Sequence, residues 1–214
     1  MRPTIQAPYQ LRLADGTAQT ATLQQFIQRA YRQEFNATIP HFLPLLLGLY
    51  RADGELVGAC GLHRADAGPL YLERYLDTPI EQVFAAKTGE RLSRPRLIEI
   101  GNFACAESGN ARILFAALCL LLCANRLDHI AFTGTRKLRN IFHRLHLSPV
   151  ELAPACADKI GAEGSLWGAY YENQPQVMVG QLRGGYDTLR KTSLLLTLFD
   201  AMPTLFSPLK QVRL

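Results

Sequence analysis

The segment that most constrains the fold is an apolar stretch, a short polar turn and an apolar helix in immediate succession. Residues 97–104 (LIEIGNFA) are apolar apart from two polar side chains and predict a buried strand with a glycine at its centre. Residues 106–111 (AESGNA) predict a turn, and residues 112–124 are rich in Leu and Ala, which favour a helix. This order leaves backbone N–H groups at a helix N-terminus, where they can bind pyrophosphate or another anion.

The elements around this unit predict an α/β protein with a mixed central sheet flanked by helices. Residues 70–76 fit a strand or a helix equally well. Gly184-Gly185 is interpreted as a boundary between a domain of residues 1–185 and an apolar extension, residues 186–214, that packs on the domain or on a partner. Strands are expected at residues 9–13, 45–50, 55–62, 128–133, 149–152, 167–171 and 176–179, and further helices at residues 23–35, 80–86 and 135–146.

The composition limits the kinds of partner. A net charge of +5 on 214 residues suits phosphates, an acidic carrier protein or an anionic membrane surface, whereas nucleic acid is not expected without a dense Lys/Arg block. The longest uncharged apolar run, residues 113–124, is shorter than the ~20 residues that span a bilayer. Without an apolar signal segment, the chain is expected to be cytoplasmic, with peripheral contact at the inner membrane left open. The chain has five cysteines, of which Cys119 and Cys123 in the apolar helix are expected to be reduced core residues, and no metal site is expected.

The order of the expected elements resembles the GNAT-like N-acyltransferase fold. In that fold the fourth strand and the next helix hold the pyrophosphate of the acyl donor, through a loop of the form Gln/Arg-x-x-Gly-x-Gly/Ala. The counterpart here is residues 106–111, in which Gly109 and Ala111 fit the loop and flank Asn110, while Ala106 and Glu107 depart from it.

A closer resemblance, over residues 24–185, is to the thermostable hemolysin family. It is carried by YRQEF (31–35), GELVG (54–58), YLERYLD (71–77), IEIGN (98–102), FTGTR (132–136), PVELAP (149–154) and WGAYY (167–171). That family is itself similar to acyl-homoserine-lactone synthases, which take acyl groups from acyl carrier protein.

In those synthases an Arg-x-x-x-Phe stretch on the first helix and a Glu on the fourth strand matter. Arg32 and Phe35 match the first feature with one residue fewer between them, and are candidates for substrate binding. Glu99 matches the second feature.

Glu99 is the leading candidate for catalysis, because an acidic side chain in a buried strand is either paired or has a raised pKa. It could be the general base that takes a proton from an attacking amine, or it could form a structural ion pair with a nearby arginine. A bulge at Gly101 would bring Asn102 to the same face as Glu99 and aim a backbone N–H at a thioester oxygen.

Aromatic and acidic side chains elsewhere supply further candidates. Tyr170 or Tyr171 could protonate the leaving thiolate, or both could form core or groove wall with Trp167, a candidate for substrate binding. Glu73 could bind an amino substrate or lie on a solvated face.

The expected helix at residues 135–146 is rich in cations. Arg136, Lys137, Arg139 and Arg144 could dock an acidic carrier protein or a phosphopantetheine arm, or they could form an ordinary solvated face. By resemblance to the GNAT-like fold, Asn140 occupies a helix position that contacts the donor.

Three functions follow from these features. The first is an N-acyltransferase that moves a fatty acyl group from an acyl carrier protein or coenzyme A thioester to a small amine, with no permanent cofactor. The second is a membrane-active or lipid-binding protein, suggested by the family name and the apolar residues 193–214. The third is a GNAT-shaped binding module without catalysis, and a homodimer is left open in each case.

Overall fold

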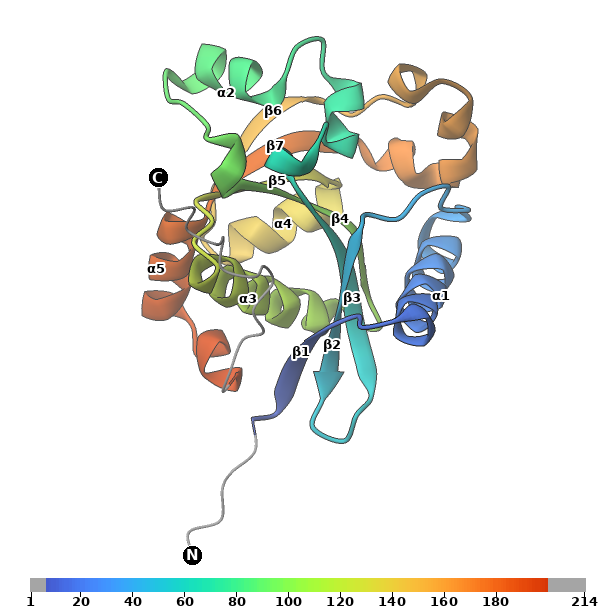
Figure 1. The fold of residues 1–214 in the computed structure, drawn as a ribbon, viewed down its shortest axis with the longest axis vertical. Helices are drawn as coiled ribbons and strands as arrows, with labels where there is room; N and C mark the ends of the chain where they lie inside the picture. The colour runs from blue at the N-terminus through green and yellow to red at the C-terminus, as the bar shows by residue number, and fades with distance from the viewer. Residues whose placement is uncertain (1–6, 200–214) are drawn as a thin grey trace, which may run out of the picture.

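A computed structural model describes residues 7–199, in which one mixed sheet carries helices on both faces (Figure 1). The strand order is β1-β2-β3-β4-β5-β7-β6, and β4 and β5 form the parallel pair in an otherwise antiparallel sheet. The strands are β1 Tyr9–Leu13, β2 Leu45–Arg51, β3 Leu56–Arg64, β4 Leu97–Cys105, β5 His129–Gly134, β6 Val150–Pro154 and β7 Gln176–Gln181.

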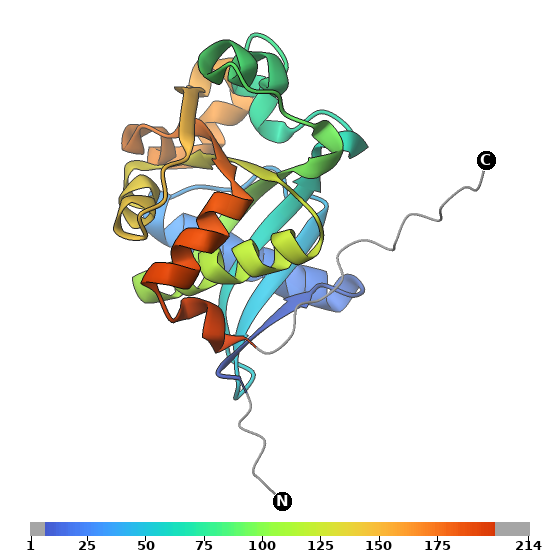
Figure 2. The same cartoon turned by 90° about the vertical axis from the view of Figure 1, so that its left-hand side faces the viewer.

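The helices divide the core into two halves, one on each face of the sheet. One half contains the buried side chains of α3, with Phe142 of α4 and Leu189 of α5, and the other contains Leu23 and Ile27 of α1. Figures 1 and 2 show α1 on the side of the sheet opposite α3 and α5. The helices are α1 Thr17–Phe35, α2 Ile80–Thr88, α3 Ser108–Ala124, α4 Arg136–Arg144 and α5 Leu182–Thr192.

The helix α3 is buried because its sequence is apolar on nearly every side. Ten of its residues are buried, from Asn110 to Leu122, as expected for a helix that is hydrophobic all round. It begins at Ser108, so the expected turn at 106–111 includes its first helical turn. None of the helices in residues 7–199 has the length and apolar character needed to cross a membrane.

The first helix, α1, begins before the expected start at residue 23. Thr22, the residue before that start, lies inside the helix, where its hydroxyl donates to the carbonyl of Ala18. The helix is closed by Asn36, the residue after its last helical residue, whose φ of 53° lies in the left-handed region that closes many helices.

Two segments expected from the sequence are 3₁₀ helices in the structure. Residues 167–171 are not a strand, because they belong to a series of 3₁₀ turns, Ala157–Asn173, interrupted at Gly161 and Gly168 by positive φ angles. The ambiguous segment 70–76 is a 3₁₀ helix, Tyr71–Tyr75. The remaining 3₁₀ helices are Ala65–Ala67, Arg94–Arg96 and Leu195–Leu198.

The C-terminal part is described only to residue 199. Gly184 and Gly185 lie inside α5 rather than in a linker. After α5, the apolar side chains of Leu195, Leu196 and Phe199 pack against the α3 side of the core. The rest of the expected apolar extension, residues 200–214, lies outside the described residues. The division into a domain and an extension stays a prediction.

Candidate functional site

The candidate site is a cavity where β4 and β5 separate. These strands pair only from Leu97 to Ile100 on β4 and from His129 to Phe132 on β5. Beyond this point β4 continues along β3, and a cavity of about 230 Å³ opens between β4, β5, α1, α3 and α4. Its wall is formed by Ala30, Tyr31, Glu34, Phe35, Phe103, Ala104, Cys105, Ala106, Glu107, Ser108, Ala111, Thr133, Thr135, Lys137, Leu138, Ile141 and Tyr170.

A β-bulge in β4 accompanies the separation of the strands, and it lies at Asn102 and Phe103, directly after the expected position at Gly101. The register between β3 and β4 shifts between Ala59 and Gly61, and Asn102 has a φ of 50°. The Asn102 side chain fixes this shape, since its Oδ1 accepts the N–H of Leu43 at 2.8 Å and its Nδ2 donates to the carbonyl of His41 at 3.1 Å. A bulge bends its strand, which explains why β4 leaves β5 here.

Space for the bulge depends on a missing side chain in the neighbouring strand. A Cβ added to Gly61 would lie 2.8 Å from Asn102 Oδ1. Asn102 is therefore a structural anchor in this protein, and both ends of its amide are occupied by the backbone of the segment before β2.

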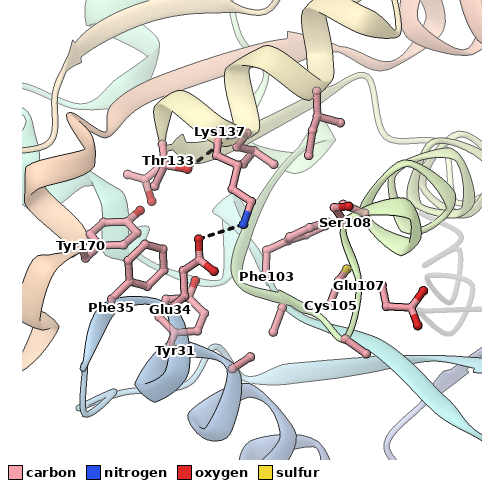
Figure 3. Close-up of a pocket in the computed structure, with 17 residues that line it drawn as sticks. Tyr31, Glu34, Phe35, Phe103, Cys105, Glu107, Ser108, Thr133, Lys137 and Tyr170 are labelled. Atoms are coloured by element: carbon pink, nitrogen blue, oxygen red, sulfur yellow. Dashed lines mark hydrogen bonds and ion pairs between the residues drawn. The ribbon is translucent and has the colours of Figure 1, made fainter.

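Tyrosine side chains form one wall of the cavity, as Figure 3 shows. Tyr31 and Phe35 come from the last two turns of α1, and the ring of Tyr170 lies 5.3 Å from that of Phe35. The Tyr170 hydroxyl is hydrogen-bonded to the Thr133 side chain, and burial raises its pKa to about 12. Tyr171 lies outside this wall, with its hydroxyl 2.9 Å from that of Tyr75.

Glu99 is buried and ties β4 to the 3₁₀ helix Tyr71–Tyr75. Its two carboxylate oxygens accept the backbone N–H groups of Tyr71 at 2.7 Å and Leu72 at 3.0 Å. Burial raises its pKa to about 7, although these hydrogen bonds act in the opposite direction. Its partners are backbone groups rather than the expected arginine, and it does not line the cavity.

The N-terminus of α3 forms the opposite side of the cavity. Ser108 and Ala111 line it, and Gly109 and Asn110 belong to the same helical turn. Within residues 7–199, the N–H of Asn110 bonds to the carbonyl of Glu107, while those of Ser108 and Gly109, at the first two positions of the helix, have no acceptor. Free N–H groups at a helix N-terminus can hold a phosphate.

The cations of α4 are joined to neighbouring elements. Lys137 forms an ion pair with Glu34 of α1 at 2.8 Å across the cavity (Figure 3). Arg136 donates to the side chain of Gln174, and Arg139 donates to the carbonyls of Gly134 and Gln174. Asn140 is exposed and does not line the cavity.

The remaining sequence candidates are dispersed. Arg32 is exposed outside the cavity, and Gly101 lies in the bulge against Leu43. Glu73 pairs with Arg94 at 2.8 Å and accepts the N–H of Leu70, so it holds a loop together. Trp167 is buried, its ring lies 6.0 Å from that of Tyr31, and its Nε1 has no partner among the described residues.

Sequence reasoning did not select Tyr31, Glu34, Cys105 or Thr133 as site residues. The signal for Tyr31 was present, since it lies four residues before Phe35 and therefore on the same helix face. Cys105 and Thr133 enter the site because β4 and β5 separate beside them, and local sequence patterns do not report that separation.

A second cavity, of about 270 Å³, lies on the α3 side of the sheet among α3, α4 and α5. It is lined mainly by apolar side chains, including Leu118, Leu122 and Ile130. A row of packed phenylalanine rings stands between the two cavities. The distance between ring centroids is 4.6 Å for Phe103 and Phe115, 4.5 Å for Phe115 and Phe142, and 5.0 Å for Phe132 and Phe142.

The family model for thermostable hemolysin matches residues 13–186, which include every element around the first cavity. The chain belongs to the thermostable hemolysin family. This confirms the resemblance drawn from the sequence motifs. A search of curated protein sequences finds no significant match.

Solved structures similar to the chain share its fold at low sequence identity. An N-acyl amino acid synthase from uncultured soil microbes, FeeM, has a TM-score of 0.58 and 15% identity, covering 90% of this chain and 98% of its own. The coenzyme A-dependent acyl-homoserine lactone synthase BjaI, solved with SAM and isopentyl-CoA, has a TM-score of 0.56 and 13% identity, covering 86% and 88%. The acyl-homoserine-lactone synthase LasI has a TM-score of 0.52 and 14% identity, covering 81% and 89%. The fold is therefore the expected GNAT-like one.

Proposed function

We propose that the chain is an N-acyltransferase that moves a fatty acyl group from a thioester to a small amine. The observation that carries this proposal is the cavity between the separating strands β4 and β5, which extends to the N-terminus of α3. A pantetheine arm is long and thin, and its phosphate end would meet the free N–H groups of Ser108 and Gly109. The structural neighbours named above are acyl-transferring synthases, which supports the same reaction class.

The fatty nature of the acyl group is inferred from the second cavity. Its apolar lining suits a hydrocarbon chain, which gains roughly 0.8 kcal/mol for each CH₂ group removed from water. The rings of Phe103, Phe115 and Phe142 stand between this cavity and the site of the thioester, so their packing would control how far a chain extends.

In the proposed reaction the amine attacks the thioester carbonyl directly, without a covalent enzyme intermediate. Glu99 does not line the cavity, so as the candidate base it would take the proton through water, which a carboxyl with a pKa of about 7 can do near neutral pH. Tyr170, with its hydroxyl in the cavity wall, stays the candidate for the acid, whereas Tyr171 is turned toward Tyr75.

The donor is either an acyl carrier protein or coenzyme A. Lys137 lines the cavity, Arg136 precedes it on α4, and both side chains are exposed, which supports contact with an acidic carrier. Side-by-side assays with acyl carrier protein and acyl-coenzyme A at rising salt would separate the two donors, because attraction between exposed charges is screened within about 10 Å at 0.1 M.

The function is tested by mass spectrometry of lipids from cells that express the chain, because the cell supplies both donor and amine. We expect new N-acylated amines, which should disappear in Ala106→Trp, since Ala106 is exposed at the edge of the cavity and a large ring there would block it. The matched control is Ala18→Trp, at an exposed alanine near the start of α1. Identical lipid profiles with and without the chain would contradict the proposal.

A further inference from the structure

Tyr31 lines the first cavity beside the bulge of β4, and the proposed function gives its hydroxyl no role. Tyr31 is 9% exposed and lines the first cavity from α1. Its hydroxyl oxygen is hydrogen-bonded to the backbone of Phe103, the residue that follows the bulge at Asn102. β5 no longer pairs with this part of β4, and Phe103 itself lines the cavity.

Packing fixes the position of the Tyr31 ring. Its centroid lies 5.6 Å from the ring of Phe35, 6.0 Å from Trp167 and 6.4 Å from Tyr170. The ring is therefore held by side chains from α1 and from the 3₁₀ series Ala157–Asn173. Because the Tyr31 oxygen accepts the Phe103 N–H, the hydroxyl keeps its own proton for donation to a ligand in the cavity that Tyr31 lines.

We propose that Tyr31 is a catalytic residue whose hydroxyl, beside the Phe103 N–H, donates a hydrogen bond to the thioester carbonyl oxygen of the acyl donor. This inference rests on the proposed function and adds a residue to it. In the bound state the carbonyl oxygen takes the place on the Phe103 N–H that the Tyr31 oxygen holds in the free protein, and the hydroxyl turns its proton toward it.

The reaction then balances without ionising Tyr31. The amine nitrogen forms a bond to the carbonyl carbon, and the C=O π electrons move to oxygen, where Tyr31 and Phe103 stabilise the charge by hydrogen bonds. When the C=O bond reforms, the C–S bond breaks and the thiolate leaves. The proton lost by the amine balances the one gained by the thiolate.

The environment suits Tyr31 to donate a hydrogen bond rather than a proton. Burial raises its pKa well above the ordinary value for tyrosine, and the neighbouring Tyr170 raises it further.

The test uses infrared difference spectra of a ¹³C=O-labelled octanoyl-pantetheine thioester bound to the full chain without any amine. In Tyr31→Phe, which keeps the ring, we expect the carbonyl band of the bound thioester to move to higher wavenumber than in the wild type. In Tyr75→Phe, which removes a buried hydroxyl bonded to Tyr171 outside the cavity, the band should stay at the wild-type position. Thermal denaturation of each variant shows that it is folded.

Turnover with an amine provides the second measurement. Loss of one oxyanion donor lowers kcat by about 10²-fold or more, and we expect this for Tyr31→Phe with little change in the KM for the thioester. If the thioester binds with the same carbonyl band in Tyr31→Phe and in the wild type, the role of Tyr31 is refuted while the proposed function stands. If the wild type binds no thioester, both are refuted.

Discussion

At the scale of single residues, Glu99 shows how burial and hydrogen bonding oppose each other at one carboxyl group. Its side chain is 3% exposed, which favours the neutral form, while two backbone N–H groups favour the charged form. Burial is the larger effect, and the charge of Glu73 adds to it. The result is a carboxyl group whose pKa of about 7 lies far above its ordinary value of 4.5.

This pKa makes the stability of the protein depend on pH. Between about 4.5 and 7 the native protein holds the Glu99 proton while the unfolded chain has lost it, so the free energy of unfolding should fall as pH rises. The Glu99→Gln variant has no such titration, so its free energy of unfolding should not change with pH for this reason. The difference in free energy of unfolding between the wild type and Glu99→Gln should therefore become smaller as pH rises from about 4.5 to 7. Urea unfolding at several pH values measures this, with Glu172→Gln, an exposed glutamate, as control. A difference that does not change with pH would contradict the assigned environment of Glu99.

Residue types at the site were partly predictable from the sequence. Two polar residues in a buried strand, Glu99 and Asn102, indicated a candidate site, and a bulge was predicted beside them at Gly101. The structure has the bulge directly after Gly101. The partners of Glu99 were not predictable, because Tyr71 and Leu72 reach it through a loop whose path depends on tertiary packing.

At the scale of elements, the junction between α1 and the 3₁₀ series Ala157–Asn173 positions the aromatic wall of the site. Gly168 has a φ of 52°, and a Cβ added there would lie 2.1 Å from the carbonyl oxygen of Phe35. This contact holds Trp167 and Tyr170, on either side of Gly168, against the end of α1.

Replacing Gly168 should therefore be costly. We expect Gly168→Ala to lower the free energy of unfolding by about 3 kcal/mol or more, near the upper range for one substitution. Gly161→Ala is the matched control, since Gly161 has a similar φ of 63° but open space around its Cβ position. It should cost only the backbone strain, about 1–2 kcal/mol. Equal losses in chemical denaturation would show that the contact with Phe35 is unimportant.

The same junction explains why one element was assigned wrongly. The sequence WGAYY at 167–171 has the aromatic residues typical of a strand, but Gly168 adopts a conformation that an extended strand excludes. The rings pack on α1 instead, and a local pattern does not reveal a partner so distant in sequence. By contrast, α3 and β4 were predictable because their apolar character is continuous.

At the scale of the whole molecule, the end of the described chain closes the core beside α3. Leu195, Leu196 and Phe199 are half-buried against the α3 side of the core, and the Phe199 ring lies 6.4 Å from that of Tyr9. Chains ending at 192 and at 199 should therefore differ in free energy of unfolding by about 3 kcal/mol, on the order of 1 kcal/mol for each such side chain. Thermal and urea denaturation measure this difference. Equal stability of the two chains would contradict the packing.

Whole-molecule topology was predictable from the order of elements and from the family motifs, which together gave the GNAT-like fold. The size of the cavities was not, because it depends on where β4 and β5 stop pairing and on how the phenylalanine rings stack. These are properties of three-dimensional packing rather than of any one segment.

The proposed function requires that the cavity between β4 and β5 bind the acyl thioester arm. The direct measurement is isothermal titration of the purified chain with a ketone analogue of octanoyl-pantetheine, in which a CH₂ group replaces the thioester sulfur, so that the carbonyl is kept but no thiol can be released. We expect saturable binding to the wild type and to Ala18→Trp, and its loss in Ala106→Trp at the edge of the cavity. Binding that is unchanged in Ala106→Trp, or no binding to the wild type at millimolar analogue, would contradict the account.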